Sequence, residues 1–340
     1  MNGQKGYGLA GASTKKRALK GLRYNMSGST REDIDENNYT LRQRGRMMTM
    51  SAPIAASAVK THRTNSIGLG LKLNRRPDND ILKMNEEELK TWQRQVKAEF
   101  NMWANHKQTC DITGINAFYG IQQLCFYSWL ASGGVFILLK RKETKNNPYT
   151  LKLQVIEADR CSTPYEGVMY TMNITQGKNP DNGNRIYDGV EVDNDGSIVA
   201  YWFRNTHPYE TTIEKTSWVR VKAYGDETGL PNVLQIMNSE RPEQYRGVTY
   251  LAPVIEEIMQ IRRYTEAELQ AAVVQAFFTA FVKQSANTLH DEGNPFNEVG
   301  DGQPGEDQAS YDPNEYEMGH GNIVMLNEGE DIVLADPKRP

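Results

Sequence analysis

The stretch RPEQYRGVTYLAPVIEEIMQIRRYTEAELQAAVVQAFFTAFV, residues 241–282, decides the architecture of this chain. Apolar residues recur every three or four positions from Val254 to Ala280, which predicts one long helix over residues 250–283. Pro253 falls in its first turn, where a proline is tolerated. At 1.5 Å per residue this helix would reach about 50 Å, more than a small domain needs. Its second half is apolar nearly all round, so we expect other helices to enclose it. The residues expected at that packing surface are Val273, Phe277, Phe278 and Phe281.

Upstream of the long helix the pattern predicts an α+β domain, with strands that follow one another instead of alternating with helices. Three helices are expected, at residues 51–66, from Asn85 to Trp103 with a capping box, and at 113–131. The stretch GLGLKLN, residues 68–74, predicts a strand. Six further strands are expected where β-branched and aromatic residues cluster: VFILLKRK (135–142), LKLQVIE (151–157), DGVEVD (188–193), SIVAYWFRN (197–205), WVRVKA (218–223) and VLQIM (233–237). Asp195-Gly196 predicts a hairpin turn, and NIVML (322–326) with DIVLA (331–335) predicts a closing strand pair.

Length and composition exclude several classes of protein. The 340 residues suggest roughly two domains, and 38% hydrophobic residues with a mean hydropathy of −0.66 predict much solvated or partner-seeking surface. The longest apolar run, residues 271–282, is too short for a bilayer span of about 20 residues, so we expect no membrane protein. The first residues lack the apolar core of a secretory signal. Three cysteines without a C-x-x-C pair favour a reducing compartment.

The two ends of the chain have opposite charge, although the net charge is only −4. Residues 1–31 hold seven Lys or Arg and no acid, whereas thirteen Asp or Glu and no Lys or Arg lie between Lys283 and Lys338. Each end could be a solvated segment or could meet a partner. The basic residues proposed to meet an anionic partner are Lys15, Lys16, Arg17, Lys20 and Arg23. The acidic residues singled out as candidates in the second segment are Glu306, Asp307, Asp312 and Glu315.

No motif in the chain predicts catalysis. The glycines of residues 6–13 are spaced as in a phosphate-binding loop, but alanine stands where the lysine is needed, and residues 68–70 lack the third glycine of a dinucleotide fingerprint. His106 and Cys110 are one helical turn apart, but no second pair joins them, and a structural zinc site needs about four ligands. The acids of residues 291–336 do not follow calcium-loop spacing. We therefore expect no catalytic residue, no metal and no cofactor.

Four stretches match one family in order along about 300 residues. They are LRQRGRMMTMSAPIAASAVKTHRTNSIGLGLKL (41–73), EFNMWANHKQTCDITGINAFYGIQQLCFYSWLASGGVFILLKR (99–141), the Arg-Pro-x-Gln-x-Arg-Gly stretch with its long helix (241–282), and GNIVMLNEGEDIVLADPKRP (321–340). Together they resemble the portal proteins of tailed phages, of the lambda type. The chain departs from that family where Gly133-Gly134 replaces an expected Gly-Glu. It also stops at Pro340, where the family continues into a return helix and crown, so we expect a fragment or a separately encoded part.

The resemblance implies a structural protein without enzymatic activity. It implies a flexible basic arm (1–35), an α+β wing (36–249), a stem helix (250–283) and the start of an acidic, β-containing clip (284–340). Twelve copies would form a ring at one capsid vertex, assembled in the bacterial cytoplasm, through which double-stranded DNA is packaged and ejected. Implied partners are the terminase motor, the scaffold or major capsid protein and a head-completion protein. The alternative that we keep open is a small nucleic-acid-binding protein that uses its basic arm.

Overall fold

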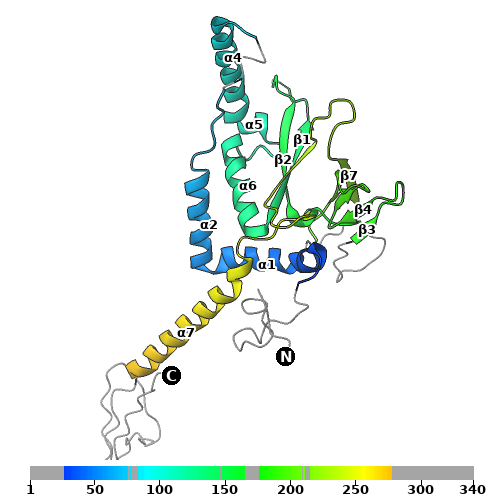
Figure 1. Cartoon of the computed structure of the whole chain (residues 1–340). Coiled ribbons are helices and arrows are strands. Elements are labelled where there is room, and N and C mark those ends of the chain that lie inside the picture. Colours follow the sequence, from blue (N-terminus) through cyan, green and yellow to red (C-terminus); the bar gives the residue numbers. More distant parts are fainter. Residues whose placement is uncertain are drawn as a thin grey trace, which may run out of the picture. The chain divides into compact units, whose positions relative to one another are not determined.

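The computed structural model describes residues 27–277, except residues 76, 78–82, 146, 165–175, 209 and 211–214. The chain divides into two compact units, residues 1–258 and 259–340. The predicted arm up to residue 26, the end of the predicted long helix and the predicted strand pair at 322–335 lie outside the described residues. The first unit mixes helices with antiparallel strands, which confirms the predicted α+β class (Figure 1).

In the described part of this unit, six helical segments precede the first strand. They are the π-helix η3 (Arg31–Asp35), α1 (Glu36–Ser51), α2 (Pro53–Ser66), α4 (Glu86–Asn105), α5 (Lys107–Cys110) and α6 (Phe118–Ser132). α1 contacts both α2 and α6 (Figure 1). The chain breaks between α1 and α2 because Ala52 takes an extended conformation in front of Pro53, as proline requires of its predecessor. The predicted capping box of α4 is present, formed by Asn85 and Glu88.

One prediction in this region is wrong, and one predicted helix is present with a later start. Residues 68–74 form no strand in the described part of the chain, because Gln122 and Gln123 of α6 bind the backbone of residues 68–71 in place of a strand partner. Leu69 is consequently 93% exposed. The helix predicted at 113–131 begins five residues later, at Phe118. The Asp111 carboxylate accepts hydrogen bonds from three backbone N–H groups between residues 113 and 116, which holds that stretch as a loop.

Two antiparallel sheets follow the helices in the described residues. The smaller has the order β2-β1-β8, from β1 (Gly134–Arg141), β2 (Leu151–Glu157) and β8 (Val233–Met237). The larger has the order β3-β4-β5-β6-β7, from β3 (Gln176–Lys178), β4 (Arg185–Tyr187), β5 (Val190–Val192), β6 (Ile198–Arg204) and β7 (Trp218–Lys222). The six strands predicted between residues 135 and 237 are confirmed, while β3 and β4 were not predicted. The predicted β5–β6 hairpin is present, and Gly196 at its turn has a φ of +85°.

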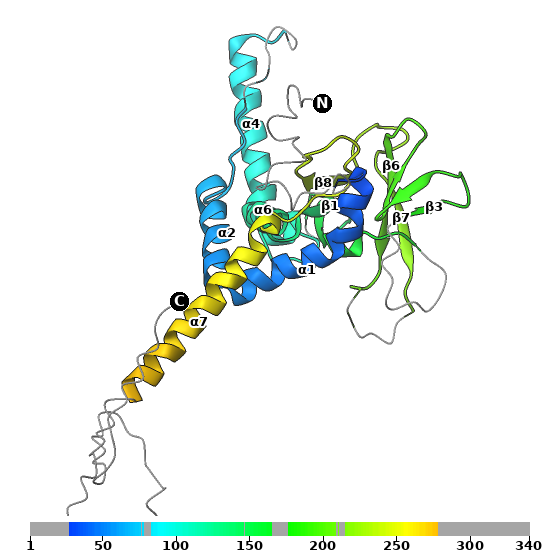
Figure 2. The ribbon, with the colours of Figure 1, turned by 60° about the horizontal axis from the view of Figure 1, so that its bottom comes forward.

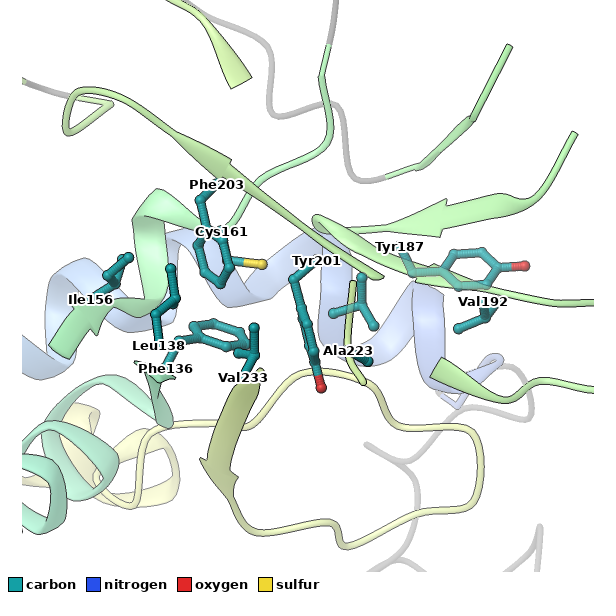
Figure 3. Close-up of a cluster of buried hydrophobic side chains, with 11 residues drawn as sticks. Phe136, Leu138, Ile156, Cys161, Tyr187, Val192, Tyr201, Phe203, Ala223 and Val233 are labelled. Carbon is teal, nitrogen blue, oxygen red and sulfur yellow. The ribbon is translucent and has the colours of Figure 1, made fainter. Parts of the chain in front are cut away.

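The core lies on both faces of the smaller sheet. Phe136 and Leu138 of β1 face the larger sheet, where the ring centroid of Phe136 lies 5.5 Å from that of Tyr201 and 5.4 Å from that of Phe203 (Figure 3). The alternate residues of β1 face the opposite way and pack with Ile121 of α6. The smaller sheet is therefore the middle of three layers, between α6 and the larger sheet (Figure 2). Because both faces of β1 are buried, its sequence is an almost continuous apolar run.

The predicted long helix starts later than expected. A 3₁₀ turn, η5 (Ala252–Val254), contains Pro253, and α7 (Ile255–Phe277) follows it. Residues 278–283, the predicted end of the helix, lie outside the described residues.

Candidate functional site: the junction before the long helix

Residues 238–251, which we call the junction, connect β8 to η5 and fold around their own side chains. Gln244 is buried, and its Oε1 accepts hydrogen bonds from the backbone N–H groups of Glu240 (2.8 Å) and Arg241 (3.1 Å). Its Nε2 donates to the carbonyl of Arg246 at 2.9 Å. Buried backbone groups outside helices and strands need such partners. The side chain of Gln244 therefore supplies hydrogen-bond partners for three backbone groups of the junction.

Arg246 joins the junction to three other elements. It is only 2% exposed, and its guanidinium donates to the carbonyls of Ala158 (2.6 Å), Cys161 (2.8 Å) and Asp188. Its Nη1 also lies 3.1 Å from the Asp188 carboxylate. The guanidinium carbon lies 5.3 Å from the centroid of the Phe136 ring in β1. A single side chain thus ties the junction to the 3₁₀ turn η4 (Ala158–Arg160), to the β4–β5 turn and to β1.

Two arginines of α1 extend this contact into a buried ionic network with the carboxylates of Asp188 and Asp159. Arg42 donates from Nε to Asp159 (2.8 Å) and from Nη1 to Asp188 (2.9 Å), and Arg46 also pairs with Asp159. Burial alone would raise the pKa of Asp159, but the hydrogen bond from His207 and the charges of both arginines hold it well below its usual range. The carboxylate therefore stays ionised. Removing one partner from such a buried pair costs about 3–5 kcal/mol.

Glycines let α1, the end of α6 and the junction meet backbone to backbone. A Cβ on Gly133, the left-handed C-cap of α6 with a φ of +79°, would lie 2.5 Å from the carbonyl oxygen of Gly247. A Cβ on Gly247 would in turn fall on the carbonyl of Gly133, and one on Gly45 of α1 would meet the carbonyl of Ala131. Gly134, in the position where an acid was expected, opens β1. Its Cβ would meet a backbone carbonyl at 3.3 Å.

Further contacts fasten the π-helix η3 and the residues just before it to the junction. Arg241 Nη1 lies 2.6 Å from Asp33 Oδ2, and the hydroxyl of Thr30 donates to the carbonyl of Pro242 at 3.0 Å. Residues 27–35, at the end of the predicted arm, therefore include a turn that packs on the folded unit, with Ile34 buried.

The contacts described so far fasten elements of the fold together. Within the ranges that the structure describes, no group of three or more His, Cys, Asp or Glu side chains could hold a metal ion. Burial raises the pKa of the Cys125 thiol and, against the charge of Arg246, that of the Cys161 thiol, each to about 12. Burial also raises the pKa of Cys110, so none of the three cysteines is an activated nucleophile. Among the described residues, no helix combines the length and apolarity needed to cross a membrane.

Only two of the predicted site residues fall within the described part of the chain, so the site stays a prediction. Val273 lies in α7 with 47% of its surface exposed, and Phe277 is the last residue of that helix. All other predicted site residues lie outside the described residues: Phe278, Phe281, Glu306, Asp307, Asp312, Glu315, Lys15, Lys16, Arg17, Lys20 and Arg23. The buried network of α1 was missed. Its one local signal is Arg42 and Arg46, one helical turn apart in LRQRGR, which place two cations on one helix face.

Comparison with known proteins identifies the family. A family model described as "Phage portal protein, lambda family" matches residues 15–340. A probable portal protein of Halomonas phage phiHAP-1 is 28% identical over 278 residues, which cover 78% of this chain and 47% of that protein. Portal protein B of Escherichia phage lambda is 19% identical, and the portal protein of Escherichia phage N15 is 22% identical, each over 69% of this chain and 41% of the relative. The chain thus spans less than half the length of these relatives. Because the family model matches nearly all of it, the chain belongs to the lambda family of phage portal proteins.

Proposed function

We propose that this chain acts as a subunit of a phage portal. Copies of it form a ring of twelve at one vertex of the capsid, and double-stranded DNA is packaged and later ejected through the ring. The terminase motor, a head-completion protein and the scaffold or major capsid protein dock on the same ring. The chain contributes structure and no catalysis. It assembles in the cytoplasm of the bacterial host and remains in the virion.

The observation that carries this proposal is the exposed apolar stripe of α7. The helix has 23 residues and is about 34 Å long, and along it Ile261 is 50% exposed, Leu269 66% and Val273 47%. Helices gain most of their stability by burying such a stripe against neighbours. Each large aliphatic side chain contributes about 1.5–3 kcal/mol when it is fully buried. Copies of α7 packed side by side would bury the stripe and form the wall of a channel.

The parts of the chain receive roles on the same basis. We assign residues 36–249 to the wing, 250–283 to the stem, 284–340 to the clip and 1–35 to an arm that meets an anionic partner. Val273, Phe277, Phe278 and Phe281 would pack between stem helices. Glu306, Asp307, Asp312 and Glu315 would line the channel or dock the motor.

The oligomeric state of the purified chain tests the proposal. Light scattering and negative-stain microscopy should show rings or other oligomers for the wild type. The double variant Ile261→Ser/Leu269→Ser should give smaller species, because it removes the apolar stripe. Arg263→Ser changes an exposed residue on the opposite side of α7 and should leave the oligomer intact. A wild type that stays monomeric at every concentration, or a stripe variant that assembles like the Arg263 variant, contradicts the proposal.

A further inference from the structure

Asp35 is a buried acid that the network does not use. It is the last residue of η3, directly before α1, and is only 4% exposed. Its side chain makes no capping hydrogen bond to the start of α1. The charged groups that face it come from four elements: Asp188 of the β4–β5 turn, Arg246 of the junction, Arg31 of η3 and Arg42 of α1.

The neighbouring arginines direct their groups elsewhere. Arg42 donates to two other aspartates, and Arg246 donates mainly to backbone carbonyls. Arg31 lies over the Tyr187 ring, with 3.9 Å between its guanidinium carbon and the ring centroid. Burial and then the charge of the neighbouring aspartate raise the pKa of Asp35 to about 6, against the attraction of all three arginines.

One helical turn after Asp35, the side chain of Asn38 contains an acceptor oxygen without a hydrogen-bond donor among the described residues. Asn38 is fully buried, and its Nδ2 donates to the carbonyl of Gly247 in the junction at 2.9 Å. Its Oδ1 has no hydrogen-bond partner in the part of the chain that the structure describes. Residues three apart on a helix are neighbours, and a neutral carboxyl group carries an O–H donor that a carboxylate lacks. The surroundings of Asp35 therefore suit its neutral form better than its ionised form.

We propose that Asp35 is a proton-controlled latch that holds η3 against the junction while its carboxyl group is neutral and loosens η3 and the start of α1 when the group ionises. The element that it controls is a single π-helical turn, a geometry that is rare and often found at functional sites. Among the described residues, the remaining ties of this turn and the residues just before it to the junction are the Asp33–Arg241 ion pair, the hydrogen bond from Arg241 to the Gly28 carbonyl and the hydroxyl of Thr30. A latch at this position would regulate how the chain before α1 leaves the folded unit.

The sign of the effect follows from proton linkage. The closed state keeps the proton up to about pH 6, whereas an opened segment releases it near the ordinary value of 3.8. Opening is therefore favoured as the pH rises through this interval. With these two values, the equilibrium constant for opening increases about tenfold between pH 5 and pH 8.

Hydrogen–deuterium exchange of the full chain tests the latch, with peptides from residues 28–41 measured at pH 5 and pH 8 and corrected for intrinsic exchange. The wild type should lose about tenfold protection between the two values. Asp35→Asn cannot ionise and should remove this pH response. Asp33→Asn is the matched control from the same turn and should lower protection at both pH values while keeping the response. His207→Asn, which removes the histidine of the network, should keep it as well.

A second measurement covers the case in which Asp35→Asn fails to fold. Carboxyl ¹³C signals of wild-type protein with labelled aspartate should include one that titrates near pH 6, and Asp35→Asn identifies it where that variant folds. The latch is wrong if every aspartate titrates below about pH 4.5. It is equally wrong if Asp35→Asn keeps the tenfold response, or if His207→Asn abolishes it.

Discussion

The close approach of the α6 C-cap to the junction predicts a large and separable cost for Gly133→Ala. A Cβ at this position would lie 2.5 Å from the carbonyl oxygen of Gly247 and 2.6 Å from the carbonyl carbon of Val248, whereas real Cβ atoms essentially never come within 3.0 Å of another heavy atom. Both obstacles are backbone, so no side chain can turn away. The helix end is itself fixed, because the Gly133 N–H donates to the carbonyl of Trp129 at 2.8 Å.

The cost has two parts that a matched control separates. Gly133 has a φ of +79°, so alanine there pays about 1–2 kcal/mol for the left-handed conformation. Overpacking against fixed backbone adds about 1–3 kcal/mol or more. Gly183, in the β3–β4 turn, has a φ of +74° and no atom within 4 Å of an added Cβ. Gly183→Ala should therefore cost only the first part.

Urea unfolding of the two variants, followed by circular dichroism, gives the comparison. We expect the free energy of unfolding to fall by about 2–5 kcal/mol for Gly133→Ala, which is the sum of the two parts, and by about 1–2 kcal/mol for Gly183→Ala. The difference between the variants measures the clash alone. If both lose the same free energy within about 0.5 kcal/mol, with unchanged m-values, the junction does not touch the helix end as described.

Three further predictions follow from the network and from α4. Arg246→Met should lower the free energy of unfolding by about 3–5 kcal/mol in urea, because it leaves the Asp188 carboxylate buried beside unpaired carbonyls, and Arg246→Lys should restore only part of the loss. Asp159→Asn should lower the thermal midpoint at pH 7. The pKa of Asp159 is depressed in the folded state, so the difference in thermal midpoint between this variant and wild type should shrink as the pH falls below about 3.8. A difference in midpoint that stays constant down to pH 2 would contradict this. Asn85→Ala removes the capping box and should destabilise α4 by about 1 kcal/mol, seen as about fivefold faster amide exchange in its first two turns, whereas Thr91→Ala in the same helix should change it little.

The sequence predicted those elements whose signals are local. Asn85 and Glu88 form the capping box that their spacing indicated, and the Asp195-Gly196 turn closes the hairpin between β5 and β6. Gly133 ends α6 in the left-handed conformation, as expected of a C-cap glycine. In each case the residues that decide the structure lie within a few positions of one another.

Elements that depend on tertiary partners were missed or misassigned. The strands at Gln176–Lys178 and Arg185–Tyr187 are three residues long, and QGK contains no β-former, so only pairing with their neighbours defines them. Residues 68–74 show a strand-like alternation, but Gln122 and Gln123 of α6 take their backbone groups instead. Propensity alone cannot show which partner a stretch will find.

The partners in the buried ionic network could not be predicted from the sequence either. Arg42, Asp159, Asp188 and Arg246 are separated by dozens of residues, and no spacing rule pairs an arginine of α1 with an aspartate more than a hundred positions later. Once the fold is known, a structural role can be given to four residues of the Arg-Pro-x-Gln-x-Arg-Gly sequence. Its first arginine holds η3, its glutamine pairs the backbone of the junction, its second arginine pairs three carbonyls and a carboxylate, and its glycine admits the end of α6. Its two arginines and its glycine therefore hold the segment that leads into the long helix against η3, η4, the β4–β5 turn and the end of α6.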